Sequence, residues 1–591
     1  MALHLGLSPL TINLAHPHRR LASFTTPRSC HVAHKIPCAT TERRSANFQP
    51  SLWDYKFIQS LRGSQKSYYL YPFIVQDDAK NAQRIEKLKE VRNLIDEEAL
   101  VRQLELIDAL QQLGIEYHFD KEIKDILATT FASLENISMM LSENLYATAL
   151  LFRVLREHGF HVSQDIFRSF KDEKGRFKAY LCKETKDILS LYQISYYALE
   201  GETTLDEARD FTTKHLKNLN ANLLDEPYLQ EDVAHALELP LNRRMRRLHT
   251  RWFIDAYKEE DSMHPVLLEL AMLDFNAVQA TYQSEFKEGS KWWNDLGLAI
   301  KLSFARDRLM ECYYWSIGWA FEPRFGFYRR TATRVNCFIS AVDDIYDVYG
   351  TLDELELFTN AVERWDVSAM EQLPDYMKPC FLAFINTTNE TAYYVLKEKG
   401  IDVIPCLRKQ WADLCKSFLV EAKWYHSGYT PTFKEYLDNA WISSSAPVTL
   451  THAYVCVSQE ITQEGLECIM SYPDIVQSTA KIFRLCDDLA GSKEELERGD
   501  VSSAIQCYMH DEGVSESVAR EHIRGMIDAF WKELNGDRFT NSPFEESFIV
   551  TAMNVARMVE CIYQYGDGYS MPDRETKDRI KLLLIDPIQF N

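Results

Sequence analysis

The chain has 591 residues, 46% of them hydrophobic, which allows about two to four domains with substantial cores. Its formal net charge of −21 and isoelectric point near 5.3 exclude a general affinity for nucleic acid or anionic lipid, because polyanions require a positive surface. No apolar run approaches the roughly 18–20 residues that cross a bilayer, so no membrane insertion is expected.

The thirteen cysteines are scattered singly between Cys30 and Cys561. They form no C-x-x-C pair and no Cys/His cluster at zinc spacing, and an odd count does not suit a complete disulfide framework. We therefore expect reduced thiols in a reducing compartment rather than a secreted protein.

Residues 1–41 differ in composition from the rest of the chain. They contain no Asp or Glu, carry four basic residues and are rich in Ser, Thr and Pro. This composition is typical of an organelle transit peptide, particularly a plastid one, and the segment lacks the compact apolar core of a secretory signal. An untargeted disordered tail is the alternative interpretation.

From residue 42 onward helical patterns dominate, and the sequence contains no credible series of alternating strands. In LVRQLELIDALQQLGIEYHF, for example, Leu104, Ile107 and Leu110 recur at helical spacing, and Gly114 is a C-terminal stop signal. Similar apolar rhythms recur along the chain, so the sequence predicts an all-α protein.

A domain boundary is expected in YKEEDSMHP, residues 257–265. There a charged polar cluster and a proline precede a strong helical pattern, and we divide the chain between residues 262 and 263. No fixed period of 20–50 residues is present, which argues against a solenoid.

A basic pair and an aromatic helix follow this boundary. Arg306 and Arg308 suit phosphate by charge and by the fork geometry of the guanidinium group, although Arg-Asp-Arg runs also occur in surface ion-pair networks. Aromatic faces stabilise cations by about 0.5–2 kcal/mol, while core packing is the alternative role. Four aromatic residues crowd the next predicted helix: Tyr313, Tyr314, Trp315 and Trp319.

The stretch FISAVDDIYDVYG, residues 338–350, places three aspartates in an apolar, aromatic segment. In a helix Asp343 and Asp347 lie one turn apart, where like charges repel by roughly 0.2–0.5 kcal/mol. No Lys or Arg lies within a turn of them. Either this face opens to water or a cation binds there, and we interpret it as a cation site.

A second acidic cluster lies in FRLCDDLAGSKEELERGD, residues 483–500. Asp487, Gly491 and Glu495 follow one helical stripe, with Arg484 one turn earlier. Oxygen ligands without His or Cys select hard ions, so Mg²⁺ suits the pattern better than zinc. A solvated acidic helix face is the alternative for either cluster alone, but two clusters flanked by apolar residues favour metal binding.

Two metal-binding acidic helices favour an anionic ligand, because Mg²⁺ on a few carboxylates keeps positions open for diphosphate oxygens. We therefore expect a phosphorylated small molecule as ligand. The sequence has no glycine-rich phosphate loop, dinucleotide fingerprint or G-x-S-x-G elbow, so nucleotide-dependent phosphoryl transfer is not supported.

These motifs resemble those of plant class I terpene synthases, closest to the angiosperm monoterpene synthases, and the resemblance covers essentially the whole chain. DDIYD at 343–347 matches D-D-x-x-D, and RDR at 306–308 matches R-x-R. DDLAGSKEE at 487–495 matches [ND]-D-x-x-[ST]-x-x-x-E in all but one position. RRSANFQPSLW matches R-R-x8-W through Arg43, Arg44 and Trp53.

The resemblance implies two α-helical domains behind a plastid transit peptide at 1–41. The first, over 42–262, would be an N-terminal helical barrel without an active site, and the second, over 263–591, a helical bundle with the catalytic cavity. It implies a monomeric lyase of the plastid stroma that uses three Mg²⁺ or Mn²⁺ ions to ionise geranyl diphosphate.

The resemblance also implies a role for each matching residue. Asp343 and Asp347 would bind two metal ions from one wall, and Asp487 and Glu495 a third from the opposite wall. The diphosphate would be held by Arg306, Arg308 and Arg484. The residues implied at the cavity or in its closing segments are Trp315, Asn336, Arg43, Arg44, Trp53, Tyr563, Asp567 and Tyr569.

One position departs from the family pattern. Gly491 stands where the family usually carries a Ser or Thr that supplies a hydroxyl to the third metal ion. Glycine has no such oxygen and costs about 1 kcal/mol relative to alanine inside a helix. A water or Ser492 could substitute, and we expect weakened metal affinity rather than lost activity.

Asn336 bears on the product because it lies seven residues before Asp343 on the same helical face. Its amide could point into the cavity, although a hydrogen-bonded helix residue is the alternative. An isoprene synthase would need a bulky residue such as Phe there, so Asn argues against a C5 product. The intact R-R-x8-W motif favours a cyclising C10 enzyme. We rank limonene-, terpineol- and cineole-type products ahead of linalool, myrcene or ocimene, and ahead of C15 sesquiterpenes.

Three other functions are alternatives to a class I terpene synthase. A prenyl elongase would carry D-D-x-x-D twice, whereas here Gly491 replaces the last aspartate of the second cluster. A proton-initiated cyclase would need D-x-D-D, which the sequence lacks. A catalytically silent helical scaffold is the non-enzymatic alternative.

Overall fold

The chain folds into helices, as its apolar periodicity predicts. The computed structural model describes residues 43, 46–61, 78–97, 99–219, 227–260, 262–498 and 502–590. Within these ranges the regular structure is helical, and β pairing is limited to one antiparallel bridge between Lys171 and Phe177. The all-α prediction is confirmed. The predicted transit peptide at 1–41 and Arg44 lie outside the described residues.

The helices that precede residue 262 are short to medium in length. They are α1 (Tyr55–Ser60), α2 (Asp78–Glu97), α3 (Leu100–Gln112), α4 (Asp120–Ala132), α5 (Leu134–Met140), α6 (Leu145–Glu157), α7 (Thr185–Ser195), α8 (Thr203–Asn218), α9 (Pro227–Glu238) and α10 (Arg246–Tyr257). Short 3₁₀ segments lie between them: η1 (Glu116–His118), η2 (Gln164–Phe170), η3 (Ala179–Lys183) and η5 (Leu241–Arg243).

The later helices include the longest of the described chain. They are α11 (Pro265–Leu296), α12 (Leu298–Lys301), α13 (Leu309–Trp319), α14 (Gly326–Asp344), α15 (Leu352–Arg364), α16 (Met377–Lys399), α17 (Ile404–Ser427), α18 (Phe433–Ser443), α19 (Ala446–Val457), α20 (Gln463–Met470), α21 (Asp474–Arg498), α22 (Ala504–Glu512), α23 (Glu516–Asp537), α24 (Glu546–Ile562) and α25 (Arg574–Leu584). Short segments are η6 (Pro323–Phe325), η7 (Ile345–Tyr349) and η8 (Val367–Gln372).

The helix predicted around residues 104–110 is α3, and its apolar stripe faces the core. Leu104, Ile107 and Leu110 are fully buried. Gly114 ends this region with a φ of 68°, and a β-carbon there would lie 2.7 Å from the Thr250 hydroxyl of α10. Glycine is required both by the left-handed backbone and by this close approach.

The expected boundary at residues 262/263 falls between two helices. Tyr257 ends α10, and Pro265 occupies the first turn of α11, where its missing N–H costs nothing. The described residues from 46 onward form one compact unit. The division at 262/263 therefore stays a prediction.

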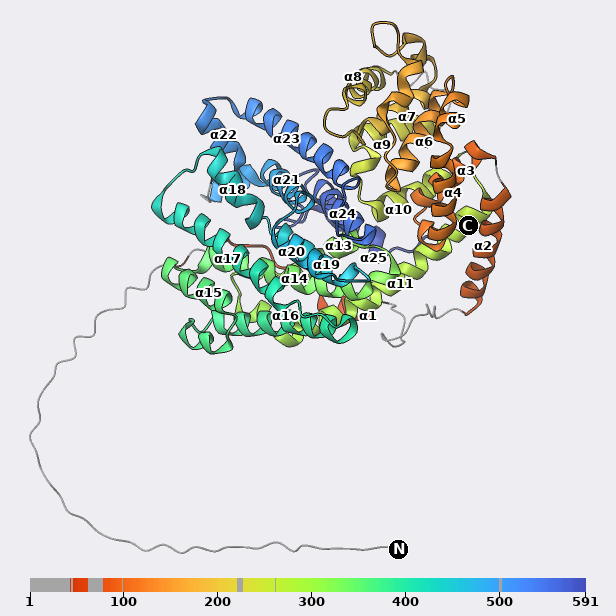
Figure 1. Ribbon diagram of the computed structural model, residues 1–591. Coiled ribbons are helices and arrows are strands. Elements are labelled where there is room, and N and C mark those ends of the chain that lie inside the picture. Colours follow the sequence, from red (N-terminus) through yellow and green to blue (C-terminus); the bar gives the residue numbers. More distant parts are fainter. Residues whose placement is uncertain are drawn as a thin grey trace, which may run out of the picture. The chain divides into compact units, whose positions relative to one another are not determined.

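The two acidic stretches are brought into one region by shared packing partners. Helix α19 packs against both α14, which ends in the first acidic cluster, and α21, which carries the second. Helix α13 packs against α14 and α24 in the same region, where these helices lie close together in Figure 1 in green to blue. Residues far apart in the sequence are thereby placed around a common centre.

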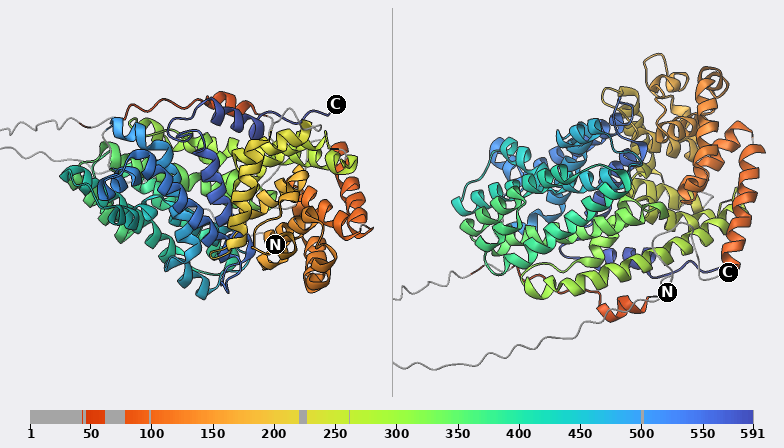
Figure 2. Two further views of the ribbon diagram at one scale, coloured as in Figure 1. Left: turned by 90° about the horizontal axis from the view of Figure 1, so that it is seen from above. Right: turned by 60° about the horizontal axis from the view of Figure 1, so that its bottom comes forward.

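Helix α1 is held against the long helix α11. Helix α1 packs beside α11, as the right-hand view of Figure 2 shows. The Gln59 side-chain amide donates to the Ser290 hydroxyl at 2.8 Å and to the Lys287 carbonyl at 3.0 Å. These contacts fix the direction in which residues 46–54 leave α1.

None of the described helices combines the length and the hydropathy that a bilayer-spanning helix requires. All cysteines in the described part of the chain are free thiols.

Candidate active site

The first acidic cluster lies where α14 changes into a wider turn. Helix α14 ends at Asp344 and continues as the π-helical segment η7, in which the Gly350 amide donates to the Ile345 carbonyl at 2.8 Å. A β-carbon at Gly350 would lie 2.7 Å from that carbonyl, so the turn requires glycine. A π-turn often occurs at functional sites because it reorients side chains. Here Asp347 lies in the turn and is exposed, while Asp343 keeps 26% of its side-chain surface exposed.

Arg306 supplies the positive charge that the local sequence around Asp343 lacks. Its guanidinium group pairs with Asp343, and its Nε lies 3.0 Å from Asp344 Oδ1. The Arg306 main-chain amide also donates to Asp344 Oδ2 at 2.7 Å. Asp344 is 1% exposed, and burial raises its pKa to about 6 although Arg306 opposes that shift. Asp344 is thus a positioning residue that holds Arg306.

The second acidic cluster repeats this division between an open and a buried carboxylate. Asp487 keeps 21% of its side-chain surface exposed and lies 3.1 Å from Arg484 Nη1. Asp488 is 1% exposed and accepts hydrogen bonds from the Tyr436 hydroxyl at 2.8 Å and from the Ala504 amide at 2.9 Å. Burial raises the pKa of both carboxyls, that of Asp487 to about 7. Only Asp487 is available to a ligand.

Helix α21 runs without interruption through the rest of the second motif. Gly491 is buried inside this helix, as predicted. Glu495 lies two turns after Asp487 on the same helix, and its side chain is outside the described residues. The helical stripe of the sequence analysis is therefore confirmed for the backbone.

The segment after α24 closes onto the arginines of the R-x-R pair. Asp567 Oδ1 accepts from the amides of Tyr569 at 3.0 Å and Ser570 at 2.8 Å, which folds this segment into a tight turn. Arg306 Nη1 then donates to the Ser570 hydroxyl at 2.8 Å, and Arg308 Nη2 donates to the Ser570 carbonyl at 2.9 Å. Asp567 and Tyr569 are thus close to the arginines, as the resemblance implies.

The N-terminal segment reaches the same pair of arginines. The Gln49 carbonyl accepts from Arg308 Nη1 at 3.0 Å, and Phe48 lies 5.2 Å from the Arg306 guanidinium carbon. Trp53 is buried, and its indole N–H donates to Glu311 Oε1 of α13 at 3.2 Å. Arg43 is exposed, and Arg44 lies outside the described residues. Two segments from opposite ends of the chain therefore meet at Arg306 and Arg308.

An aromatic group lies beside the acidic and basic residues. Trp315 stacks on Phe483 of α21 with ring centroids 5.1 Å apart, and the edges of Tyr563 and Tyr569 approach it at 6.2 and 6.1 Å. Tyr563 also lies near Asp487, and burial together with the charge of Asp487 raises the pKa of the Tyr563 phenol. Of the four aromatic residues predicted on α13, Trp315 contacts Phe483, and Trp319 packs edge-on against Trp315 with ring centroids 5.8 Å apart.

Asn336 is held close to α13. Its amide donates to the Cys312 carbonyl at 3.5 Å, a long hydrogen bond, and 9% of the residue is exposed. The Cys312 thiol in turn lies 3.4 Å from the Tyr569 hydroxyl. Asn336 is therefore adjacent to the aromatic group, which suits the cavity position suggested by its spacing from Asp343.

Glu421 of α17 belongs to this region, although no sequence motif predicts it. Its carboxylate accepts from Asn439 Nδ2 at 3.1 Å and from the Ser443 hydroxyl at 2.5 Å. Burial raises its pKa to about 7, and its charge interacts with Arg484 and Asp343, so it lies between the two acidic clusters. A single glutamate in SFLVEAKWYHS carries no motif signal, and only the packing of α17 reveals its position.

The accessible carboxylates fit a hard divalent cation. In the described part of the chain no three His, Cys, Asp or Glu side chains already form a metal cluster. Mg²⁺ takes one or two carboxylates per ion and completes its octahedron with water and phosphate oxygens. Asp343, Asp347 and Asp487 all stay accessible, and their donor atoms are oxygens.

The helical fold, the two open acidic segments and the arginines beside them have the features of a metal-dependent enzyme that acts on a diphosphate. The chain belongs to the terpene synthase family. Residues 52–237 match the family description "Terpene synthase, N-terminal domain", and residues 294–533 match "Terpene synthase family, metal binding domain". The resemblance inferred from the motifs is confirmed.

Relatives of known activity cover nearly the whole chain. A chloroplastic myrcene synthase of Quercus ilex is 50% identical over 98% of this chain and 96% of its own length. An (−)-α-terpineol synthase of Vitis vinifera is 50% identical over 92% of this chain and 91% of its own length. Among solved structures, limonene synthase with 2-fluorolinalyl diphosphate has a TM-score of 0.88 at 41% identity, covering 93% of this chain and 100% of that one.

A second solved structure bears on the metal site. Isoprene synthase from grey poplar (Populus x canescens), in complex with three Mg²⁺ ions and dimethylallyl-S-thiolodiphosphate, has a TM-score of 0.82 at 46% identity and covers 91% of this chain and 99% of that one.

The Gly491→Thr variant tests whether the missing hydroxyl weakens metal binding. We expect the variant to reach half of its maximal activity at a lower Mg²⁺ concentration than the native chain, because a threonine hydroxyl adds one oxygen donor on the α21 stripe. Steady-state kinetics over a Mg²⁺ titration measures this. An unchanged half-saturating Mg²⁺ concentration would show that the missing hydroxyl at residue 491 does not weaken metal binding.

Proposed function

We propose that this protein is a monoterpene synthase that ionises geranyl diphosphate, guides cyclisation of the resulting cation and releases diphosphate. The observation that carries the proposal is the placement of Asp343 and Asp487 on α14 and α21, each beside an arginine, Arg306 or Arg484. The named activities of the relatives from Quercus ilex and Vitis vinifera support the C10 substrate class.

Divalent ions would be held from two sides. Asp343 and Asp347 would hold two ions, and Asp487 with Glu495 a third, in keeping with the three Mg²⁺ ions in the isoprene synthase structure. Bound Mg²⁺ or Mn²⁺ supplies Lewis-acid stabilisation of the negative charge that develops on the leaving group. The oxygen-only donors favour Mg²⁺, and Mn²⁺ is the alternative.

The arginines bind the diphosphate and orient its leaving oxygen. Arg306 and Arg484 are held beside Asp343 and Asp487, and Arg308 is fixed by main-chain carbonyls of the two closing segments. Guanidinium groups preorganised in this way stabilise the leaving group without reorganising during the reaction. The allylic C–O bond can then ionise without a nucleophile or general base from the protein.

The closing segments and the aromatic group protect and stabilise the cation. Residues 48–53 and 567–570 meet over Arg306 and Arg308, so they can exclude water once the substrate is bound. The faces of Trp315, Phe483 and Tyr563 stabilise positive charge by about 0.5–2 kcal/mol each. Isomerisation to bound linalyl diphosphate and closure to an α-terpinyl cation would follow, with the released diphosphate as a base.

Cyclic products of the limonene, terpineol and cineole type remain our first choice. Acyclic C10 products such as linalool, myrcene or ocimene are the second, and a C15 product the third. The relatives include both a myrcene synthase and an α-terpineol synthase, so they do not separate the first two. Residue 336 is Asn rather than a bulky Phe, which supports a C10 over a C5 substrate.

The proposed domains are a plastid transit peptide at 1–41, an N-terminal helical domain at 42–262 and a catalytic domain at 263–591. The family matches at 52–237 and 294–533 lie on either side of the proposed boundary. Chloroplastic relatives support plastid import, and we propose a monomer in the stroma.

The experiment that tests this function is product analysis with purified protein lacking residues 1–41. Geranyl, neryl and farnesyl diphosphates are supplied separately with Mg²⁺, and geranyl diphosphate is also supplied together with isopentenyl diphosphate. The products are separated by gas chromatography. We expect geranyl diphosphate to give C10 products, with one molecule of diphosphate released for each molecule of product. A C15 product alone would assign a sesquiterpene synthase, coupling with isopentenyl diphosphate would assign an elongase, and no diphosphate release would assign a scaffold.

A further inference from the structure

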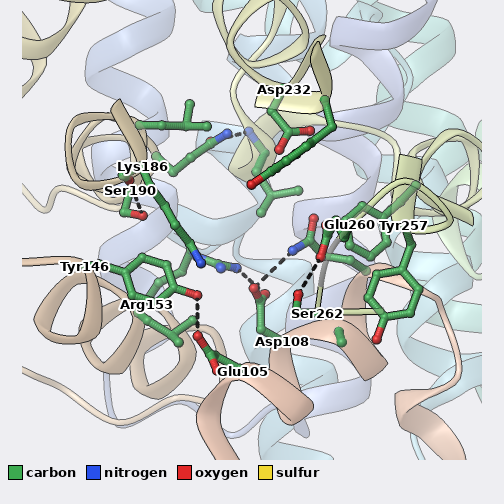
Figure 3. Close-up of a pocket in the computed structure, with 18 of the residues that line it drawn as sticks. Glu105, Asp108, Tyr146, Arg153, Lys186, Ser190, Asp232, Tyr257, Glu260 and Ser262 are labelled. Carbon is green, nitrogen blue, oxygen red and sulfur yellow. Dashed lines mark hydrogen bonds and ion pairs between the residues drawn. The ribbon is translucent and has the colours of Figure 1, made fainter. Parts of the chain in front are cut away.

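A cavity of about 650 Å³ lies among α3, α6, α7, α9 and α10, and none of the proposed active-site residues lines it. Figure 3 shows its charged and aromatic lining. A volume of this size is in the range of small-molecule sites. The cavity is therefore a candidate for a ligand unrelated to the diphosphate chemistry.

Some of the charged groups in the cavity neutralise one another. Arg153 Nη1 lies 2.8 Å from Asp108 Oδ1 and 3.7 Å from Glu157 Oε2. Glu105 accepts a hydrogen bond from the Tyr146 hydroxyl at 3.0 Å. The dashed lines in Figure 3 mark the Arg153–Asp108 and Tyr146–Glu105 contacts of this cavity wall. Arg153 neutralises Asp108, whereas the Tyr146 hydrogen bond fixes Glu105 without removing its charge.

Two carboxyl groups on the other side of the cavity form no close ion pair with a cation of the described residues. Asp232 of α9 makes no hydrogen bond or ion pair within that part of the chain, and Glu260 accepts only from the Ser262 hydroxyl at 3.2 Å. The Lys186 ammonium lies over the Tyr146 ring, 4.0 Å from its centroid, and forms no ion pair with a described carboxylate. Arg102 and Arg244 also line the cavity, and Arg244 pairs with Glu238 at 3.1 Å. Lys186 is the cation whose charge acts on Asp232 and Glu260, and one ammonium against two carboxyls leaves this side of the cavity locally negative.

Aromatic side chains border these carboxyls and bring no charge of their own. Trp252 and Tyr257 of α10 line the cavity, and the Trp252 ring stacks on His235 with centroids 3.6 Å apart. Burial lowers the pKa of His235 to about 3, so its imidazole is neutral and cannot compensate Asp232 or Glu260. Carboxylates beside aromatic faces are suited to an organic cation.

We propose that this cavity binds a protonated aliphatic amine, with the ammonium group between Asp232 and Glu260 and the methylene groups against Trp252 and Tyr257. A charged nitrogen there completes hydrogen bonds that the protein leaves open, and the apolar chain replaces water on the aromatic wall. Nothing in this proposal depends on the diphosphate site, which lies on other helices.

The ionisation of the two carboxyls makes proton release on amine binding depend on pH. Burial raises the pKa of Asp232 to about 6, with Glu231 adding to the shift and Lys186 opposing it. Burial likewise raises the pKa of Glu260 to about 7, with Asp232 and Asp108 adding to the shift. An ammonium ion between them lowers both values, so binding at pH 6.5 releases protons, whereas at pH 8.5 both groups are already ionised and binding releases none.

The test is isothermal titration calorimetry of the full chain with three C4 probes at equal ionic strength: 1,4-diaminobutane, 1,4-butanediol and succinate. We expect diaminobutane to bind with 1:1 stoichiometry, and the neutral and anionic probes not to bind. Titrations at pH 6.5 in buffers of different ionisation enthalpy measure the proton release. Binding of succinate, or absence of diaminobutane binding, would overturn the proposal.

Matched variants locate the binding. Asp232→Asn and Glu260→Gln preserve side-chain size, and each is expected to weaken diaminobutane binding at least about tenfold, the effect of roughly 1.4 kcal/mol. The exposed Asp210→Asn control and the Asp343→Asn/Asp487→Asn variant should bind as the native chain does. Circular dichroism verifies folding of every variant. If only the Asp343→Asn/Asp487→Asn variant loses binding, the amine occupies the diphosphate site and the proposal is wrong.

Discussion

Replacing Asp343 or Asp487 by Asn is expected to lower kcat for geranyl diphosphate by about 10²–10³-fold, the usual effect of removing one preorganised electrostatic group from an active site. Each substitution keeps the shape of the side chain and removes one carboxylate charge. Both carboxylates are partly exposed, and each lies beside an arginine. The loss should therefore arise from metal and diphosphate binding rather than from unfolding.

The control for this experiment is Asp353→Asn, which changes an exposed aspartate in the first turn of α15, six residues after Asp347. It should keep the native kcat and the native dependence on Mg²⁺. Kinetics over a Mg²⁺ titration distinguishes the two groups of variants, because the active-site variants should also need more metal. A native rate in the Asp343→Asn/Asp487→Asn double variant would remove the basis for the proposed mechanism.

Replacing Arg306 by Gln is expected to impair both turnover and folding. The guanidinium group contacts Asp343, Asp344 and Ser570, and Asp344 is almost fully buried. Removing one partner of a buried ion pair costs about 3–5 kcal/mol, because the remaining charge is left without compensation. Loss of a group that holds the diphosphate should also lower kcat by about 10²–10³-fold.

A second substitution separates these two effects. In the Arg306→Gln/Asp344→Asn variant the uncompensated buried charge is gone, so the free energy of unfolding should recover most of its native value. Activity should stay low, because the diphosphate still lacks Arg306. Denaturant unfolding and steady-state kinetics measure the two quantities. Recovery of activity together with stability would show that Arg306 acts only by holding the fold.

The sequence predicted those parts of the structure that depend on short-range patterns. The stripe of Leu104, Ile107 and Leu110 identified α3 because burial of one face at helical spacing is a local property. The two acidic motifs were found because their spacing within one helix is fixed by helix geometry. The family was recognisable for the same reason, since its motifs are short and occur in a fixed order.

The contacts between distant segments could not be predicted from such patterns. Arg306 and Asp343 are 37 positions apart in the sequence. A search for basic residues within one helical turn of Asp343 therefore could not identify Arg306 as its partner. Glu421 was missed because it is a single carboxylate whose position depends on how α17 packs. The π-turn at η7 was also missed, because the sequence suggests a regular helix through Asp347 and only the close approach at Gly350 shows otherwise.

The division within each acidic pair is a further result that the motifs did not contain. In DDIYD and DDLAG the first aspartate is partly exposed, while the second, Asp344 or Asp488, is buried and bonded to protein groups. Adjacent aspartates thus have different roles. The first is open to ligands, while the second holds protein groups: Asp344 holds an arginine, and Asp488 holds a tyrosine and the start of a helix. Burial, which the sequence does not show, decides between these tasks.

The central claim is that carboxylate-bound divalent ions drive the departure of diphosphate from a prenyl chain. The most direct measurement is diphosphate release from geranyl diphosphate by the purified protein with Mg²⁺, after chelation, and after excess Mg²⁺ is restored. We predict equal molar amounts of diphosphate and C10 product with Mg²⁺, no release after chelation, and recovery when Mg²⁺ is added back. Turnover that continues at the same rate in the presence of the chelator would contradict the claim.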